Sequence, residues 1–250
     1  FFAVFPNVKH LIYDAISSDT ALNAYEKHYG IRGLADYDFS KVKVLVSIDA
    51  DILGDWQGGG FEGGYAKSRI PKGDNGKAEM SWHIQFESNM SLSGANADHR
   101  VPCTPAEHKN ILAYIYDSIK GSSPSSNLSP SLKKNADKAV NRLKAAGVKG
   151  VLVSGIEDET AQSIVLAINT LLKSKAFQPF SPKLIRQGNT ASVQKVFKEI
   201  ENGTIKGLIT VCVNPVFTYA NGSILGEAIK KLEFSLAFAS KKDETANSAK

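Results

Sequence analysis

Short apolar runs alternate with amphipathic stretches along most of this 250-residue chain. The β-branched runs at 41–48 and 148–155 predict buried strands, and the alternating pattern at 83–88 predicts another. Apolar positions that recur every three or four residues predict helices between them. Further strands are expected at 8–13, 182–187, 206–213 and 233–240, and helices at 131–146, 159–173, 191–201 and 223–232.

The strongest helix signal lies at 105–120. Thr104 suits the N-cap, Pro105 suits the first helical position, and Glu107 completes a capping box. Gly121 ends the pattern. Strands that alternate with helices through short loops predict a mostly parallel sheet covered by helices on both sides. We therefore expect an α/β protein with three αβα layers.

A Ser- and Pro-rich segment, GSSPSSNLSP at 121–130, is the clearest linker signal. It predicts a first α/β half at 1–120, a linker at 121–132 and a second α/β half at 133–250. The chain starts without Met or a basic leader and stops without an obvious terminal element. We therefore expect it to be a fragment of a longer protein.

The net charge of +5 is distributed unevenly. The first 120 residues carry 12 Lys and Arg against 15 Asp and Glu, whereas the remaining residues carry 18 against 10. The lysines of the basic half are spread along predicted helix faces and are not interleaved with aromatic residues. This pattern is typical of solvated helix faces, so we expect no nucleic-acid partner.

Cysteine spacing and hydropathy exclude further classes. Cys103 and Cys212 are far apart and form no CxxC pair, which argues against a zinc ribbon or an iron–sulfur cluster built within this chain. No apolar stretch reaches the roughly eighteen residues of a membrane span. No G-x-S-x-G motif accompanies the five histidines, so a hydrolase triad has no local support.

Ligands of parallel α/β sheets lie beyond the carboxyl ends of the strands, so the loops after Ile48, Ser154, Gln187 and Val213 are the candidate sites. In the first loop, Gly58-x-Gly60-x-x-Gly63 has the spacing of a dinucleotide fingerprint. The glycines lie ten residues beyond the strand, however, and carboxylates that repel phosphate intervene. These are Asp49, Asp51 and Asp55.

Two interpretations of these carboxylates stay open. They could bind a metal ion such as Mg²⁺, or they could cap helices and hold the loop through hydrogen bonds. The EF-hand spacing is not met, and we favour the second interpretation. Asn214 and Pro215 follow a predicted strand, where Asn214 either holds a tight turn or lines a ligand site.

Six segments, in this order along the chain, resemble the large-subunit domain of the molybdopterin oxidoreductase superfamily. They are VLVSIDADILGDW, GGYAKSRIP, MSWHIQFESNMSLSGANADHRVP, VLVSG, VNPVF and FASKKDETANSA. The resemblance is closest to the fused molybdopterin/iron–sulfur subunit of bacterial alternative complex III, which belongs to a quinol-oxidising respiratory complex. It implies a Rossmann-like sheet of the molybdopterin-oxidoreductase type.

The resemblance also implies where a pterin dinucleotide would lie. In catalytic members, the strand that ends at Ser47 and Asp49 lines the cofactor groove, near Asp51. Glu87, Ser88 and Asn89 stand where those members carry Asp, Pro or Thr, and Arg at the guanine end of the cofactor. Loss of the Arg removes a bidentate donor suited to phosphate or purine. Asn214 retains the family residue near the pterin.

We therefore expect a vestigial pterin groove formed by Ser47, Asp49, Asp51, Glu87, Asn89 and Asn214, in a scaffold that performs no chemistry and has lost molybdenum. No catalytic residue or metal ligand is assigned, and iron–sulfur clusters are expected only in the remainder of the chain. The expected partners are iron–sulfur, haem and quinol-binding subunits on the periplasmic side of a bacterial membrane.

Two alternatives of other classes remain. The chain could be an active module that binds molybdopterin guanine dinucleotide, or it could bind an unrelated nucleotide through the glycine pattern. We interpret the glycines at 58–64 as a flexible or closely packed surface loop where a neighbouring subunit docks. Replacing Gly59 and Gly60 by Ala is then expected to weaken complex assembly more than the stability of the chain.

Overall fold

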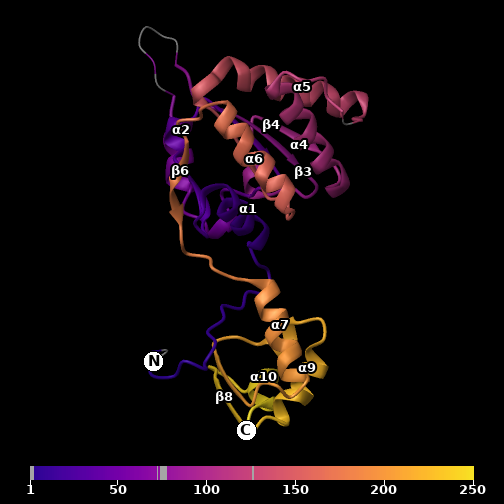
Figure 1. Cartoon of the computed structure of the whole chain (residues 1–250). Coiled ribbons are helices and arrows are strands. Elements are labelled where there is room, and N and C mark those ends of the chain that lie inside the picture. The colour runs from indigo at the N-terminus through magenta and orange to yellow at the C-terminus, as the bar shows by residue number, and fades with distance from the viewer. Residues whose placement is uncertain (1–2, 72, 74–77, 126) are drawn as a thin grey trace. The chain divides into compact units, whose positions relative to one another are not determined.

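The computed structural model describes residues 3–71, 73, 78–125 and 127–250. The chain divides into a larger unit, Thr20–Arg186, and a smaller unit that combines Phe1–Asp19 with Gln187–Lys250 (Figure 1). The smaller unit is therefore built from both ends of the sequence, and the larger unit is one continuous segment between them.

A four-stranded parallel sheet forms the centre of the larger unit, in the order β4-β3-β2-β5. The strands are β2 (Val44–Ile48), β3 (Trp82–Glu87), β4 (His99–Pro102) and β5 (Gly150–Ser154). In register, Ile48 lies beside Phe86 of β3 and Ser154 of β5, so the strands end at one common edge. This confirms the α/β class with a parallel sheet flanked by helices.

Three helices cover one face of this sheet. They are α4 (Pro105–Lys120), α5 (Pro130–Ala146) and α6 (Glu159–Leu171). Alternate strand residues such as Val46, Ile84 and Leu152 pack against apolar residues of these helices in a buried core. The capping box predicted for α4 is present: the Thr104 N–H donates to the Glu107 carboxylate at 2.8 Å.

The opposite face is covered by α1 (Asp19–Tyr29), α2 (Glu62–Arg69) and an antiparallel pair of strands, β1 (Leu34–Tyr37) and β6 (Phe177–Lys183). A second core lies here, in which Leu45 and Val153 contact a group of packed aromatic rings. Those rings belong to Tyr25, Tyr37, Phe39, Phe61 and Phe177. Short α3 (Leu92–Asn96) lies between β3 and β4.

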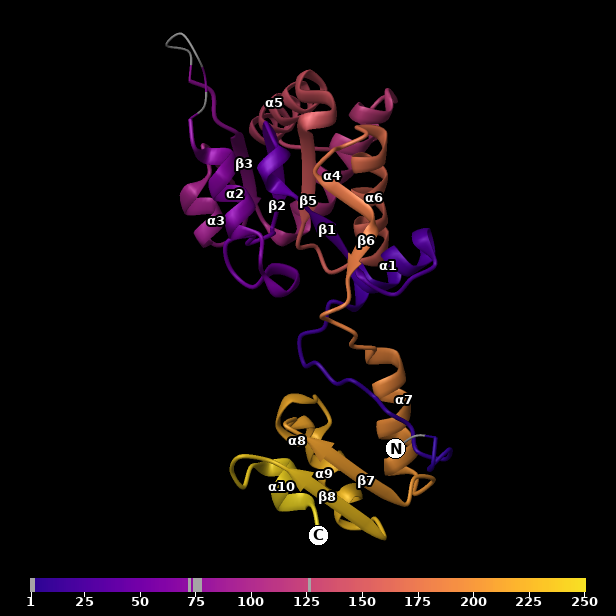
Figure 2. The ribbon, with the colours of Figure 1, turned by 90° about the vertical axis from the view of Figure 1, so that its left-hand side faces the viewer.

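The smaller unit contains two parallel strands, β7 (Gly207–Val211) and β8 (Phe234–Phe238). One face packs on α7 (Thr190–Glu201) and α9 (Gly222–Lys230), whose apolar side chains form a third core that Leu208 of β7 contacts. Short helices α8 (Pro215–Thr218) and α10 (Glu244–Ser248) complete this unit (Figure 2).

The structure places most of the predicted elements within two or three residues of their expected bounds, but two predicted strands are wrong. Residues 8–13 are not a strand, because no neighbouring strand pairs with them; Leu11 and Tyr13 pack on the core of the smaller unit instead. The strand expected at 182–187 lies at Phe177–Lys183, where its pairing with β1 sets the register.

The division into units also differs from the predicted halves. The predicted linker at 121–132 runs from the end of α4 into the first turn of α5, inside the larger unit, and both helices contribute to one core. The units instead meet in sequence at 19–20 and 186–187. Ser- and Pro-rich composition indicated a loop correctly, but the core that joins its two flanking helices decides which residues form one unit.

We expect Gly155→Ala to destabilise the larger unit by about 1–3 kcal/mol, because overpacking against fixed backbone has this cost. An added Cβ at Gly155 would lie 1.9 Å from the Asp49 carbonyl oxygen. The matched control is Gly63→Ala in α2, where nothing lies within 4 Å and the higher helix propensity of Ala predicts no loss. Urea unfolding followed by tryptophan fluorescence measures this unit, since Trp56 and Trp82 both belong to it. Equal midpoints for the two variants would contradict the expectation.

We expect the larger unit to lose stability as the pH falls from about 6.5 to 4. Burial lowers the pKa of His83 to about 4, against the opposing effect of its hydrogen bond with Gln85. The unfolded chain therefore binds a proton in this window that the folded chain does not, which corresponds to about 3 kcal/mol. His83→Gln should flatten this part of the stability–pH curve, and an unchanged slope would refute the assignment.

Candidate functional site

The candidate site lies at the carboxyl edge of the parallel sheet. From β2, the next two strands in sequence, β3 and β4, lie on one side of it, whereas β5 lies on its other side. The direction of strand order therefore reverses between β2 and β5. Ligands of α/β proteins bind at such a reversal, beyond the carboxyl ends of the strands. Asp49, Ser88 and Gly155 are the first residues after β2, β3 and β5, respectively.

Backbone atoms of the loops after β2 and β5 are in contact at the point where the strand order reverses. The Gly155 N–H donates to the Ile48 carbonyl at 2.9 Å, and the Gly155 Cα lies against the Asp49 carbonyl so closely that any side chain there would collide with it. Asp49 adopts φ 55°, in the left-handed region that few residues other than glycine occupy. The gap between β2 and β5 is thus filled by main chain, which leaves no groove for a pyrophosphate at that point.

Glu87, at the end of β3, is buried and fully engaged. Its carboxylate accepts from Arg100 Nε at 2.5 Å and from Ser91 Oγ at 2.6 Å. It also lies against Gly94, where an added Cβ would fall 1.8 Å from Oε1. A buried carboxylate requires this kind of charged partner. Glu87 therefore joins β3 to β4 and to the start of α3.

Asp51 and Ser47 hold the loop that follows β2. The Asp51 carboxylate accepts from the Ser93 N–H at 2.9 Å and from Ser93 Oγ at 2.7 Å. Ser47 Oγ donates to the Ala50 carbonyl at 3.0 Å. Asp51 therefore ties this loop to α3, whereas Ser47 bonds within the loop itself.

Asp49 lies near a histidine. Its Oδ2 is 3.6 Å from Nδ1 of His108, a buried residue in α4. Nε2 of the same ring is 3.4 Å from Oγ of Ser88, which is exposed. Burial raises the pKa of Asp49; His108 opposes this effect, and the charge of Glu87 adds to it.

The two asparagines of the predicted site lie in different units. Asn89 is exposed after β3 in the larger unit. Asn214 belongs to the smaller unit, where its Oδ1 accepts from Thr245 Oγ1 at 2.8 Å and its Nδ2 donates to Glu244 at 2.6 Å. Asn214 thus ties the turn after β7 to the start of α10, which is the turn-holding role considered from the sequence.

These residues fit a pterin dinucleotide poorly. Glu87 pairs with Arg100, so neither its carboxylate nor this guanidinium is free to bind a guanine. Asn89 offers no charge there, and the carboxylates of Asp49 and Glu87 would repel phosphate. Asn214 already satisfies its polar atoms through Thr245 and Glu244.

The acidic loop offers no composite metal site within the described part of the chain. No group of three or more His, Cys, Asp or Glu side chains is arranged to hold a metal ion there. Asp55 pairs with Arg186 at 3.1 Å, and Asp51 bonds Ser93. The three aspartates that are close in sequence therefore point to three different partners.

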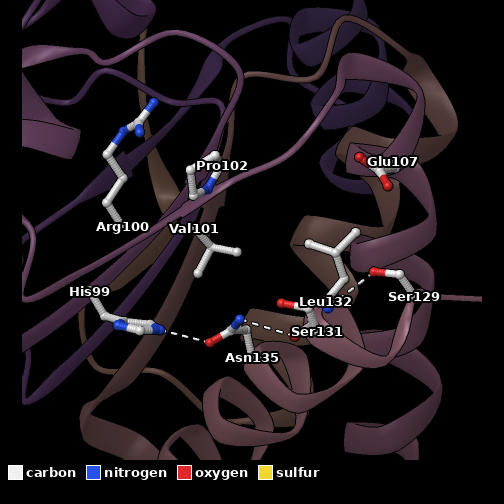
Figure 3. Close-up of a pocket in the computed structure, with 9 residues that line it drawn as sticks. All are labelled: His99, Arg100, Val101, Pro102, Glu107, Ser129, Ser131, Leu132 and Asn135. Atoms are coloured by element: carbon white, nitrogen blue, oxygen red, sulfur yellow. Dashed lines mark hydrogen bonds between the residues drawn. The ribbon is translucent and has the colours of Figure 1, made fainter.

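A cavity of about 280 Å³ lies between β4 and the N-terminal turns of α4 and α5. Its polar groups bond one another: His99 Nε2 lies 2.7 Å from Asn135 Oδ1, and Asn135 donates to the Ser131 carbonyl (Figure 3). Ser129 accepts from the Leu132 N–H as the cap of α5. Arg100 extends away from these groups toward Glu87. The polar side chains named here already have hydrogen-bond partners within the protein, so this cavity is a weak candidate for a ligand site.

Contacts with Lys183 and Ile185 hold the glycine-rich loop in place. Gly58, Gly59 and Gly60 all have positive φ, at 83°, 71° and 86°. Lys183 Nζ donates to the Gly59 carbonyl at 2.9 Å, and the side chain of Ile185 lies where a Cβ of Gly58 would be. The left-handed conformation requires these glycines, so our expectation for the Gly59 and Gly60 variants is revised: the backbone itself opposes alanine.

Sequence reasoning missed His108 and Ser88 as a pair. The signal that could have found them is strand alternation: Ile84, Phe86 and Ser88 share the face of the sheet that α4 covers. His108 lies one turn into α4, next to that face. Only the pairing of β2 with β3 brings Asp49 to the same ring.

No protein-family model matches this chain, and no curated protein sequence matches it significantly. The resemblance to the molybdopterin oxidoreductase superfamily therefore stays a prediction. Within the described ranges, none of the helices combines the length and the apolar character needed to cross a bilayer.

We expect Gly60→Ala to destabilise the larger unit by about 1–2 kcal/mol, the usual cost of a left-handed residue with a Cβ. The φ of 86° at Gly60 is the reason, since its added Cβ would otherwise be 3.5 Å from Lys183 Nζ, an ordinary contact. Gly63→Ala, three residues along the same loop and helix, again serves as the control. A urea midpoint equal to that of the control would show that the loop relaxes freely.

Proposed function

We propose that this chain is an interaction domain that holds neighbouring protein subunits together and performs no molybdenum chemistry. One observation carries the proposal: the sheet of the smaller unit leaves one apolar face uncovered. Ile209, Val211, Phe234, Leu236 and Phe238 form this face and are between 38% and 60% exposed. We call these five residues the β7–β8 face.

Strand alternation separates the two sides of this sheet. Thr210 and Ser235 are buried on the side of α7 and α9, while their neighbours in sequence are exposed on the other side. Val211 lies directly beside Phe238 in register, and Ile209 lies beside Leu236. The side chains of the β7–β8 face therefore form two adjacent rows, one on each strand. Figure 2 shows the ribbons of β7 and β8 side by side.

Physical reasons make such a face unusual on an isolated protein. Parallel strands occur almost only in sheets that are covered on both faces, and two strands alone are marginally stable. A contiguous apolar patch on a soluble protein marks an interaction surface. A protein partner that brings its own apolar side chains would supply the missing layer and remove the β7–β8 face from water.

The resemblance suggests the kind of partner. In a quinol-oxidising respiratory complex, the neighbours would be iron–sulfur, haem and quinol-binding subunits on the periplasmic side of the membrane. The engagement of Glu87 with Arg100, and of Asn214 with Thr245, supports the proposed loss of the pterin. Stoichiometric molybdenum or tungsten in the intact complex would contradict that part of the proposal.

We expect Phe238→Glu to abolish co-purification of the chain with its partner subunits without unfolding it. Phe238 is 55% exposed, so the substitution adds charge to the β7–β8 face and leaves the buried core of the smaller unit intact. Co-expression with the neighbouring subunits, affinity capture and size-exclusion chromatography measure assembly. Circular dichroism of the isolated chain measures folding.

The matched control is Phe180→Glu in the larger unit, where the phenylalanine is 87% exposed and lies outside the β7–β8 face. It introduces the same charge and removes the same aromatic ring, and we expect it to assemble normally. Unchanged assembly of Phe238→Glu would refute the docking role of the β7–β8 face. Equal loss with both variants would show that the effect is not specific to this face.

A further inference from the structure

Three side chains from separate segments lie next to one another at the carboxyl edge of the sheet in the larger unit, with a histidine between a serine and an aspartate. Ser88 Oγ lies 3.4 Å from His108 Nε2, and His108 Nδ1 lies 3.6 Å from Asp49 Oδ2. A hydroxyl, an imidazole and a carboxylate in this order, each on the correct ring nitrogen, form the arrangement of a nucleophile, its general base and the group that orients the base.

The fold explains why the three meet. Ser88 continues the alternate positions of β3 that face α4, and a turn leads directly from it to α3. A nucleophile between a strand and a following helix is the placement that acyl-transfer enzymes of α/β type use, here without the glycines of the G-x-S-x-G motif. Parallel pairing of β2 with β3 brings Asp49 to the same end.

The exposure of Ser88 and the burial of His108 agree with the roles of nucleophile and general base. Ser88 is exposed and can meet a substrate, whereas only 2% of the His108 side chain is exposed, so its ring is held in place by packing. Distances of catalytic hydrogen bonds are often long before substrate binds. Asp49 has a φ of 55°, and residues in such sparsely populated conformations cluster at functional sites.

The surroundings of Ser88 provide two further requirements. Asn89 and Met90 follow Ser88 directly and are exposed, so their backbone N–H groups are the donors that the proposal assigns to an oxyanion next to the serine. Met90 and Leu92 are 71% and 60% exposed, and they offer apolar contact to an acyl chain at the surface. Arg100 is already engaged by Glu87, which disfavours anionic substrates.

We propose that Ser88, His108 and Asp49 form an esterase-type site for small, uncharged esters of apolar acids. Ser88 Oγ bonds to the ester carbonyl carbon while His108 Nε2 takes the hydroxyl proton. The carbon–oxygen bond to the alcohol breaks, and His108 returns the proton to the leaving alkoxide. Water, deprotonated by His108, then attacks the acyl carbon. The bond from this carbon to Ser88 Oγ breaks, His108 returns the proton to Oγ, and the acid and free Ser88 are released. Asp49 is a positioning residue that holds the imidazole.

This site is independent of the proposed docking role. Ser88, His108 and Asp49 all belong to the larger unit, whereas the β7–β8 face belongs to the smaller one. Either proposal can therefore fail without the other, and Phe238→Glu should leave ester hydrolysis unchanged.

The test uses the intact 250-residue chain with p-nitrophenyl butyrate and a fluorophosphonate probe. We expect the probe to label the wild-type chain at Ser88, identified by mass spectrometry of peptides. Ser88→Ala should remove the label and lower ester hydrolysis about a hundredfold, within the range that proton-transfer catalysis contributes. Asp49→Asn should lower kcat with little change in KM, because the carboxylate orients His108 and does not touch the ester.

Ser123→Ala, at an exposed serine of the loop between α4 and α5, is the matched control and should retain both label and rate. His108→Gln replaces a buried side chain, so its circular dichroism is compared with that of Ser88→Ala before its rate is interpreted. Absence of label on the wild-type chain, or a hydrolysis rate that Ser88→Ala leaves unchanged, would overturn the proposal.

Discussion

Parallel pairing on both sides of β2 is the interaction on which the larger unit depends. Because Ile48 lies beside both Phe86 and Ser154, the loops after three strands start at the same height and their polar residues share one edge. The pairing is so close at that edge that the backbones of Gly155 and Asp49 are in contact, and Asp49 adopts a left-handed conformation there. The contact closes the usual groove of an α/β sheet and turns the Asp49 side chain toward His108.

The pairing of carboxylates with cations and hydrogen-bond donors determines which residues at this edge are free to bind a ligand. Burial of Glu87 without a partner would cost several kcal/mol, so Arg100 and the cap of α3 converge on it. The same residues are then unavailable to a phosphate or a purine. Asp51 and Asp55 each find a separate partner in the larger unit, Ser93 and Arg186. Ser88 stays exposed at this edge, and its Oγ lies 3.4 Å from Nε2 of the buried His108.

In the smaller unit, by contrast, apolar side chains on one face of the sheet are exposed to solvent. Its helices α7 and α9 bury one side of β7 and β8, and the third core is confined to that side. At about 25 cal/mol for each Å² of apolar surface, covering the other face would stabilise an assembly appreciably. The two units therefore differ in what they expose: polar groups at the edge of one sheet, and apolar side chains on one face of the other.

Sequence pattern alone predicted the long helices and the central strands β2, β3 and β5, because apolar periodicity and capping residues such as Thr104 and Gly121 act locally. It did not predict α1, α2 or β4. It also placed the polar residues after β2 and β3 at one edge. Tertiary structure decided the rest. The register of β6 follows from its partner β1, the boundaries of the units follow from which helices share a core, and the role of each carboxylate follows from the cation or hydroxyl that reaches it. These depend on contacts between residues far apart in the chain, which no local pattern encodes.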